Sequence, residues 1–427
     1  MGIPEVDAYI EDFTAFVTAS PSSYHAAEEV ARRLEAAGFD RLDEGEAWPS
    51  GAGRRVVVRD GAVIAWVQPE SAGPITPFRI LGAHTDSPSF KLKPNPSSAA
   101  AGLSQANVEV YGGPLLNSWL DRELRLAGRL VTADGATHLV ATGPLLRIPQ
   151  LAIHLDRGVN ADGLTLDKQR HVQPIWGVEV GLEPADVVGH LAGLAGIDPD
   201  DVVGHDVHVA DAAAPARFGR GDVFLASGRM DNLTSVHAGL TALLEAPADA
   251  AHINVLAAFD HEELGSESRS GASGPFLDDV LTRIGAGLGA GVEDRRRAFA
   301  ASWHVSSDAG HAVHPNYPER HDPVNRPVLG GGPLLKLNAN QRYATDAAGS
   351  ARWAAACRAA GVPTQPFVSN NTIPCGSTIG PLTATRLGIR TVDVGPPLLS
   401  MHSARELAHV DDLRALGAAV AAFFAGA

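Results

Sequence analysis

The sequence predicts an α/β protein of more than one domain, and three observations lead to this prediction. Short apolar runs of strand length alternate with longer runs whose apolar residues have helical spacing. Acidic and imidazole side chains follow directly after several of the short runs, as they do at the strand ends of open α/β sheets. The chain of 427 residues is also too long for one core of ordinary size. We therefore expect a main α/β domain with a mixed central sheet flanked by helices, interrupted by an inserted β-rich domain.

Five apolar runs predict the strands of the main domain. Asp60-Gly61 joins the first two runs as a hairpin turn would. The third run delivers His84 at its carboxyl end, and the fourth delivers Asp260. In chain order the expected strands are residues 55–59, 62–67, 78–83, 253–259 and 391–394.

Four longer stretches predict helices. Ser22 can cap the first of them before residue 26, and Gly38 ends it. Gly361 ends the third, and Pro363 follows. The expected helices are residues 5–38, 230–246, 344–360 and the packed helix that ends in 416–427.

Residues 95–221 predict the inserted domain. This stretch is rich in Val, Gly, Pro and Asp and contains short alternating runs such as 107–111 and 204–210. Pro94-Asn95-Pro96 and Arg220-Gly221-Asp222 are the expected hinges. Residues 1–94 and 222–427 would then form the main, catalytic domain.

The composition excludes several classes of partner. Acidic residues outnumber basic ones by 49 to 34, and the resulting net charge of −15 argues against nucleic acid and against anionic membrane surfaces. Any anionic substrate must therefore be held by a local cation. The two cysteines, Cys357 and Cys375, form no disulfide framework, so we expect a reducing cytoplasm. The first residues resemble no signal peptide, and no apolar run reaches membrane-spanning length.

His84-Thr85-Asp86 is the first short motif with chemical meaning. His84 is a candidate metal ligand, and Asp86 would fix the ring by accepting its second N–H. The alternative is a loop histidine beside a helix-capping aspartate. Asp231, in Arg229-Met230-Asp231-Asn232, is either a helix N-cap or a carboxylate that bridges two cations.

Asp260-His261-Glu262-Glu263 is the most specific motif. Adjacent glutamates usually belong to a solvated helix surface, but these follow an apolar strand directly and precede a Gly-Ser turn. Neighbouring side chains diverge, so Glu263 can bind a metal while Glu262 stays free to act as a general base.

Two later motifs complete the set of candidate ligands. Asp308 follows a serine pair, and His402 lies in Met401-His402-Ser403, where we expect the last helix to start. His311 and His314 are candidate ligands, substrate contacts or structural turn residues; Pro315 argues against a long helix there and favours substrate contacts. Cys375 is a candidate nucleophile or a small filler, and the filler is favoured because no basic helper stands beside it.

Together the motifs supply two histidines and three carboxylates as ligands, with one spare carboxylate as a base. This set suits two zinc-like ions that share a bridging carboxylate. The motifs resemble those of the aspartyl aminopeptidase family, peptidase family eighteen, over nearly the whole chain. They occur in the family's order: AHTDSPSFKLKP, LLRIPQLAIHL, SGRMDNL, DHEELGS, SSDAGHAVHPNY, LKLNANQRYATD, TIPCGSTIGP and MHSARE.

The resemblance implies a two-zinc aminopeptidase that prefers an N-terminal Asp or Glu and assembles as a tetrahedral dodecamer of dimers. The inserted domain would serve dimerisation and act as a lid. In this family's pattern His84 and Asp308 hold one zinc, Glu263 and His402 hold the other, Asp231 bridges them, and Glu262 is the base.

The resemblance also implies substrate contacts. Lys336 would meet the acidic side chain of the substrate, and Tyr343 and His311 would line the same site. His154, within Leu151–Leu155, would be presented by the inserted domain to a neighbouring subunit's site, although an apolar run with one imidazole is most simply an interface strand.

Two rivals to an aminopeptidase remain from the sequence. One is a carboxypeptidase or an N-acyl amino-acid deacylase with a similar site. The other is a catalytically silent assembly protein, against which Glu262 and the full ligand set weigh. Carboxylate-rich sites also accept Mn²⁺ or Co²⁺ in place of Zn²⁺.

Overall fold

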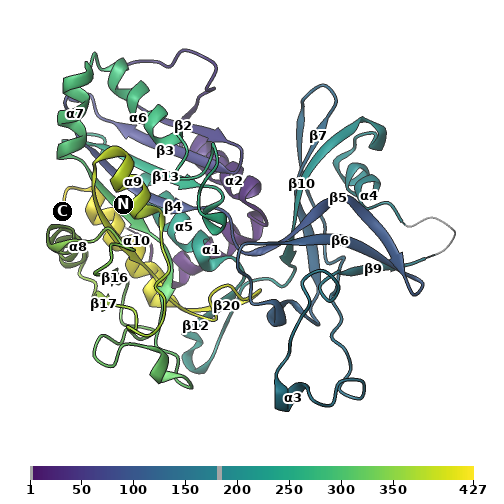
Figure 1. The fold of residues 1–427 in the computed structure, drawn as a ribbon. Coiled ribbons are helices and arrows are strands. Elements are labelled where there is room, and N and C mark those ends of the chain that lie inside the picture. Colours follow the sequence, from purple (N-terminus) through teal and green to yellow (C-terminus); the bar gives the residue numbers. More distant parts are fainter. Residues whose placement is uncertain (1–2, 180–184) are drawn as a thin grey trace.

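A mixed sheet lies at the centre of the main part of the molecule (Figure 1). The computed structural model describes residues 3–179 and 185–427. Within these residues the sheet has the order β1-β2-β3-β13-β4-β14-β18-β16-β17. Its strands are β1 Asp40–Arg41, β2 Gly53–Arg59, β3 Ala62–Gln68, β4 Phe78–His84, β13 Ile253–Phe259, β14 Trp303–Ser307, β16 Leu334–Lys336, β17 Gln365–Phe367 and β18 Arg390–Gly395. All five predicted strands are confirmed, each within two residues at either end.

Four neighbouring strands of this sheet are parallel. β4 pairs in parallel with β13 on one side and β14 on the other, and β14 pairs in parallel with β18. The carboxyl ends of these strands therefore meet at one edge of the sheet, where open α/β sheets bind their ligands.

Helices cover both faces of the sheet. One set of helices packs on one face of the sheet through a first hydrophobic cluster. Another set packs on the opposite face through a second cluster. The first set is α1 Val6–Ala19, α2 Ser23–Ala36, α5 Met230–Leu244, α8 Ala347–Ala360 and α10 Val410–Phe424. The second set is α6 Phe276–Gly287, α7 Val292–Ala301 and α9 Ile379–Leu387. All four predicted stretches are helical, but residues 5–38 form two helices, α1 and α2, with Ser22 as the N-cap of α2.

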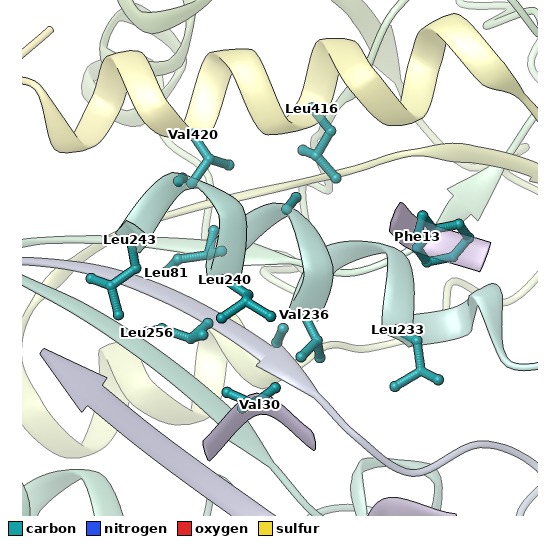
Figure 2. Packing of buried hydrophobic residues seen from close by; sticks show 14 of the residues in the cluster. Phe13, Val30, Leu81, Leu233, Val236, Leu240, Leu243, Leu256, Leu416 and Val420 are labelled. Carbon is teal, nitrogen blue, oxygen red and sulfur yellow. The ribbon is translucent and has the colours of Figure 1, made fainter. Parts of the chain in front are cut away.

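Helix α5 is the most deeply buried of them and carries Asp231 at its first turn. Its apolar residues pack between α10 and the sheet, as Figure 2 shows: Leu233, Val236, Leu240 and Leu243. At Gly239 a Cβ atom would stand 2.4 Å from Leu81 of β4, so only glycine allows this close approach. Burial of each leucine side chain contributes about 1.5–3 kcal/mol. The helix start that carries Asp231 is thus anchored to the core.

A second sheet has the order β8-β7-β10-β5-β6-β9 and is antiparallel throughout. It packs its own hydrophobic cluster against α4 and stands beside the main sheet (Figure 1). Its elements are β5 Ser89–Ala100, β6 Leu103–Tyr111, β7 Leu124–Thr132, β8 Thr137–Ala141, α3 Val159–Asp162, β9 Ile175–Val178, α4 Val187–Ala195 and β10 Val202–Asp211.

The predicted boundary of the inserted domain after residue 94 falls inside β5. Pro94-Asn95-Pro96 is no hinge, because the strand continues through it with a shift of register between Leu92 and Ser97. Proline is tolerated at such bulges, where it removes no ladder hydrogen bond. The sheet pairing instead favours an insertion that runs from Ser89 to Asp211, and the division into two domains stays a prediction.

A third, smaller sheet joins the segment after β10 to the C-terminal part of the chain. Its order is β11-β12-β20-β19-β15, with β11 Ala216–Phe218, β12 Phe224–Ser227, β15 Gly310–His311, β19 Pro397–Leu399 and β20 Glu406–His409. Arg220–Asp222 is a single 3-10 turn between β11 and β12.

Two predicted helix starts were wrong. α8 begins at Ala347 and not at residue 344, because the Asp346 side chain caps it by accepting from the Gly349 N–H. His402 does not start the last helix: strand β20 intervenes, and α10 begins at Val410. Within the described residues, no helix has the length and apolar character needed to cross a membrane.

Candidate active site

The carboxyl edge of the parallel strands gathers the predicted ligands. β4 ends at His84, the turn after β13 carries Glu262 and Glu263, and Asp308 follows β14. Asp231 comes from the start of α5, and His402 from the loop between β19 and β20. Among the described residues, three overlapping groups have ligand atoms within 4.8 Å of one another: His84, Asp231 and Asp308; Asp231, Glu263 and His402; and His84, Glu262 and Glu263.

Asp231 stands between the two histidines. Its Oδ1 atom lies 3.3 Å from His84 Nε2, and its Oδ2 atom lies 3.4 Å from His402 Nε2. His84 Nε2 also lies 3.3 Å from Asp308 Oδ1, and His402 Nε2 lies 3.5 Å from Glu263 Oε2. One carboxylate thus belongs to two separate groups, each completed by one histidine and one further carboxylate.

These separations suit a metal better than hydrogen bonds. Good N–H···O hydrogen bonds measure about 2.7–3.2 Å, whereas two ligands about 2.1 Å from a tetrahedral zinc stand roughly 3.4 Å apart. Asp231 Oδ1 and Glu263 Oε1 are also buried without a hydrogen-bond partner. A buried oxygen without a partner costs free energy unless a cation satisfies it. The donor set therefore fits divalent metal ions.

The acid–base properties of the site point the same way. Burial raises the pKa of Glu262 to about 8 and raises that of Glu263 well above its ordinary value, and neighbouring carboxylates add to both shifts. Burial opposes a charged ring at His402, but Asp231 and Glu263 outweigh it and raise the pKa of His402 to about 10. The crowded carboxylates thus demand positive charge, which protons or metal ions can supply.

Asp86 holds the glutamate turn as well as the His84 ring. Its carboxylate accepts from the backbone N–H of Glu262 at 3.1 Å and of Glu263 at 3.2 Å. His84 Nδ1 lies 3.1 Å from the Asp86 backbone carbonyl and 3.4 Å from its carboxylate. The hydroxyl of Tyr111, at the end of β6, donates to Asp86 Oδ2 at 2.8 Å.

A cavity of about 660 Å³ opens onto the ligand groups. This volume is typical of a site for a small ligand. Asp231, Glu262, Glu263, Asp308 and His402 all lie on its wall.

Three predicted substrate-binding residues lie on the same wall: His311, Lys336 and Tyr343. Lys336 is buried at the end of β16, where its Nζ donates to the Ala309 carbonyl at 2.7 Å and lies 3.3 Å from Asp308 Oδ2. It also stands 5.4 Å from the centre of the Tyr343 ring. His314 belongs to a turn outside the cavity wall, where its ring accepts from the Asn316 N–H.

His154 does not line this cavity. The prediction of an interface strand at Leu151–Leu155 was wrong. This run is an exposed loop, closed by a turn in which the Leu155 N–H donates to the Ala152 carbonyl. Leu151, Ile153 and Leu155 are 58%, 46% and 75% exposed, so the loop presents an apolar surface next to the imidazole.

Sequence reasoning missed three residues around the ligands. Tyr111 contacts Asp86, the Gly113 carbonyl contacts His402 Nδ1 at 3.0 Å, and Glu406 contacts the backbone of two ligands. The sequence marks these positions only weakly. Gly113 belongs to a Gly-Gly pair after a predicted strand, and Glu406 is the last residue of the motif MHSARE. Cys375 neither pairs with Cys357 nor joins a ligand group among the described residues; it stands beside Tyr343.

Comparison with known proteins matches this chain over almost its full length. The family model described as aminopeptidase I zinc metalloprotease, M18, matches residues 16–424. The chain is 57% identical over 422 residues to a probable M18 family aminopeptidase 2 of Streptomyces avermitilis, with 98% of each chain covered.

Solved structures agree. The chain superposes with a TM-score of 0.95 on the structure described as the Ape4 and Nbr1 complex, at 35% identity and with 99% of this chain and 87% of that chain covered. It superposes with a TM-score of 0.84 on the S. cerevisiae mApe1 dodecamer, at 28% identity and with 98% and 96% covered. The predicted family and α/β fold are confirmed, and the chain belongs to the M18 family of zinc aminopeptidases.

Proposed function

We propose that this aminopeptidase binds two zinc ions and removes N-terminal Asp or Glu residues from peptides. The observation that carries the two-metal part is the position of Asp231, whose two oxygens face the two histidines. In this proposal His84 and Asp308 hold one ion, Glu263 and His402 hold the other, and Asp231 bridges them. Mn²⁺ or Co²⁺ would suit the same oxygen-rich ligands.

Glu262 is the proposed general base. Bound zinc would polarise the scissile carbonyl and acidify a nearby water. Glu262 accepts the proton of the attacking water and returns it to the departing amine. Glu262 also forms a group with His84 and Glu263, so its assignment rests on its being the carboxylate that the two groups around Asp231 do not use.

The preference for acidic residues rests on Lys336. This cation lines the cavity beside the ligand groups in a protein of net charge −15. A substrate carboxylate drawn into such a site needs a fixed cation, because burial without one is costly. His311 and Tyr343 on the same wall would contact the substrate backbone and side chain.

The active form is proposed to be a homo-oligomer, a tetrahedral dodecamer of dimers. The S. cerevisiae relative, which matches over nearly its full length, is described as a dodecamer. The exposed apolar loop around His154 supports an interface there, through which His154 would reach a neighbouring subunit's site. A cytoplasmic location stays a prediction that rests on the two unpaired cysteines.

A rate series over aminoacyl anilides tests this function. The series compares N-terminal Asp, Glu, Ala and Leu, each with a free and with an acetylated amine. We expect the highest kcat/KM for free Asp and Glu, and no cleavage of the acetylated compounds. Release of acetate from the acetylated compounds, without release of the aniline, would support the deacylase alternative. Equal rates on Leu and Asp would remove the acidic preference.

A further inference from the structure

Glu406 is a buried carboxylate that the proposed chemistry does not use. It lies on β20, is 2% exposed, and belongs to none of the candidate ligand groups among the described residues. Among the described residues, Glu406 forms no salt bridge with a cationic side chain within 4.0 Å. A carboxylate buried in this way needs hydrogen-bond donors to remain in place.

The donors come from the backbone of two ligands. Glu406 Oε2 accepts from the Asp231 N–H at 3.0 Å, and Glu406 Oε1 accepts from the His402 N–H at 3.0 Å. Asp231 belongs to the start of α5 and His402 to the loop before β20, and both residues meet in one ligand group. A single side chain therefore ties together two backbone segments that share one metal position.

We propose that Glu406 is a positioning residue that fixes the distance between Asp231 and His402, and so sets the affinity of the zinc ion that these two share with Glu263. This inference rests on the proposed function, because it takes the ligand roles from there. Glu406 does not touch the substrate or a metal; it acts through the two backbone amides.

Both backbone segments need such support. His402 has φ 64°, and Arg229, two residues before Asp231, has φ 60°, so each segment passes through the left-handed region with a non-glycine residue. Conformations of this kind are strained for a non-glycine residue and persist only where the surroundings hold them. Two hydrogen bonds accepted by one buried side chain, from the Asp231 N–H and from the His402 N–H, provide that restraint.

Glu406→Gln is the informative variant. An amide of the same shape has one acceptor oxygen, and its NH₂ group would face the other backbone N–H, donor against donor. One of the two segments then loses its restraint, whichever way the amide turns.

Asp412 supplies a matched control. It is 1% exposed, and it likewise accepts from two backbone amides, those of Gly330 and Gly332, each at 2.7 Å. That loop carries no candidate ligand among the described residues. Asp412→Asn therefore removes the same kind of interaction from a buried site without loosening a ligand.

The experiment measures zinc binding to the full-length wild type, Glu406→Gln and Asp412→Asn by chelator competition, with unfolding temperature recorded beside it. Loss of a group that orients a ligand typically weakens metal binding 10- to 100-fold. We expect a loss of about that size for one of two zinc ions in Glu406→Gln, and wild-type zinc affinity in Asp412→Asn despite a lowered unfolding temperature.

The outcomes separate the inference from the function beneath it. A wild type that binds fewer than two zinc ions would contradict the proposed two-metal site. Two ions bound with unchanged affinity in Glu406→Gln, or an equal loss in Asp412→Asn, would overturn the role of Glu406. If Glu406→Gln does not fold, Glu406→Asp, which keeps the charge but shortens the reach, is expected to show the same selective loss.

Discussion

His402 Nδ1 donates to the carbonyl oxygen of Gly113, 3.0 Å away, across 289 positions of sequence. Because a carbonyl can only accept, this contact fixes a proton on Nδ1 and turns Nε2 towards Asp231 and Glu263. The Leu115 N–H in turn donates to the His402 carbonyl at 2.9 Å. The segment after β6 thus orients a candidate ligand from the loop between β19 and β20.

Gly112, in the same segment, should not tolerate a larger side chain. Its φ is 69°, and a Cβ atom there would lie 3.1 Å from the Cβ atom of Glu263. Gly112→Ala should therefore displace Glu263 and lower both zinc content and kcat. Gly102→Ala is the control, because Gly102 has φ 77° with nothing within 4 Å and so pays only the backbone strain, about 1 kcal/mol. Equal effects of the two changes on zinc content would show that the contact with Glu263 is unimportant.

Lys336→Met should reduce the preference for acidic substrates. The change keeps the apolar stem but removes the charge, and loss of a partner to a buried carboxylate costs about 2–5 kcal/mol, at least roughly thirtyfold in kcat/KM. The measurement is kcat/KM for Asp and Leu anilides, with zinc counted because Lys336 also contacts Asp308.

Arg320→Gln is the control for Lys336, since Arg320 is another cation on the cavity wall. It should change the selectivity far less. A uniform loss on Asp and Leu substrates in Lys336→Met would identify Lys336 as a support of Asp308 alone.

His154→Phe should reduce activity without changing the zinc content. His154 lies outside the cavity of its own subunit, so its effect must come through assembly. A donor that stabilises the developing oxyanion is worth on the order of 3 kcal/mol. Mixing His154→Phe chains with inactive Glu262→Gln chains should restore activity, because some mixed sites combine an intact Glu262 with a neighbour's intact His154. Subunit exchange without recovery would contradict a shared site.

The buried His304 should make the free energy of unfolding depend on pH. It lies on β14 with no exposure, its Nε2 has no partner, and burial lowers its pKa to about 3. Below about pH 6.5 His304 therefore binds a proton in the unfolded chain but stays neutral in the folded chain. The free energy of unfolding then decreases as the pH falls from 6.5 towards 3. One proton corresponds to about 1.4 kcal/mol per pH unit.

Urea unfolding between pH 6.5 and pH 5 measures this slope. The slope should be smaller by about one proton in His304→Gln. The same change at His138, on strand β8, controls for the loss of an imidazole as such. An unchanged slope in His304→Gln would contradict the prediction.

The sequence was informative where a pattern is local. Periodic apolar residues predicted α5 and β13, because their spacing follows directly from helix and strand geometry. The candidate ligands could be named because each follows such an element. Pro94 and Pro96 predicted a hinge where strand β5 in fact continues, because proline more often ends a strand than occupies a bulge within one.

The supports of the ligands could not be predicted in the same way. Glu406 lies 175 positions from Asp231, and Gly113 lies still further from His402. In each of these contacts one of the two hydrogen-bonding groups belongs to the backbone. Every residue type carries such backbone groups, so the sequence does not show which residue takes part. The apolar run around His154 misled for a related reason: an exposed apolar loop and a buried strand have the same composition.

Glu262 and Glu263 are adjacent in the chain but have separate proposed roles, as the general base and as a zinc ligand. The direct measurement is zinc per chain together with kcat in Glu262→Gln, Glu263→Gln and, as a control, exposed Glu267→Gln. We expect Glu262→Gln to keep two zinc ions and lose about 10²- to 10⁴-fold in kcat, Glu263→Gln to lose zinc, and Glu267→Gln to behave as the wild type. Loss of zinc in Glu262→Gln, or turnover that survives this change, would contradict the account.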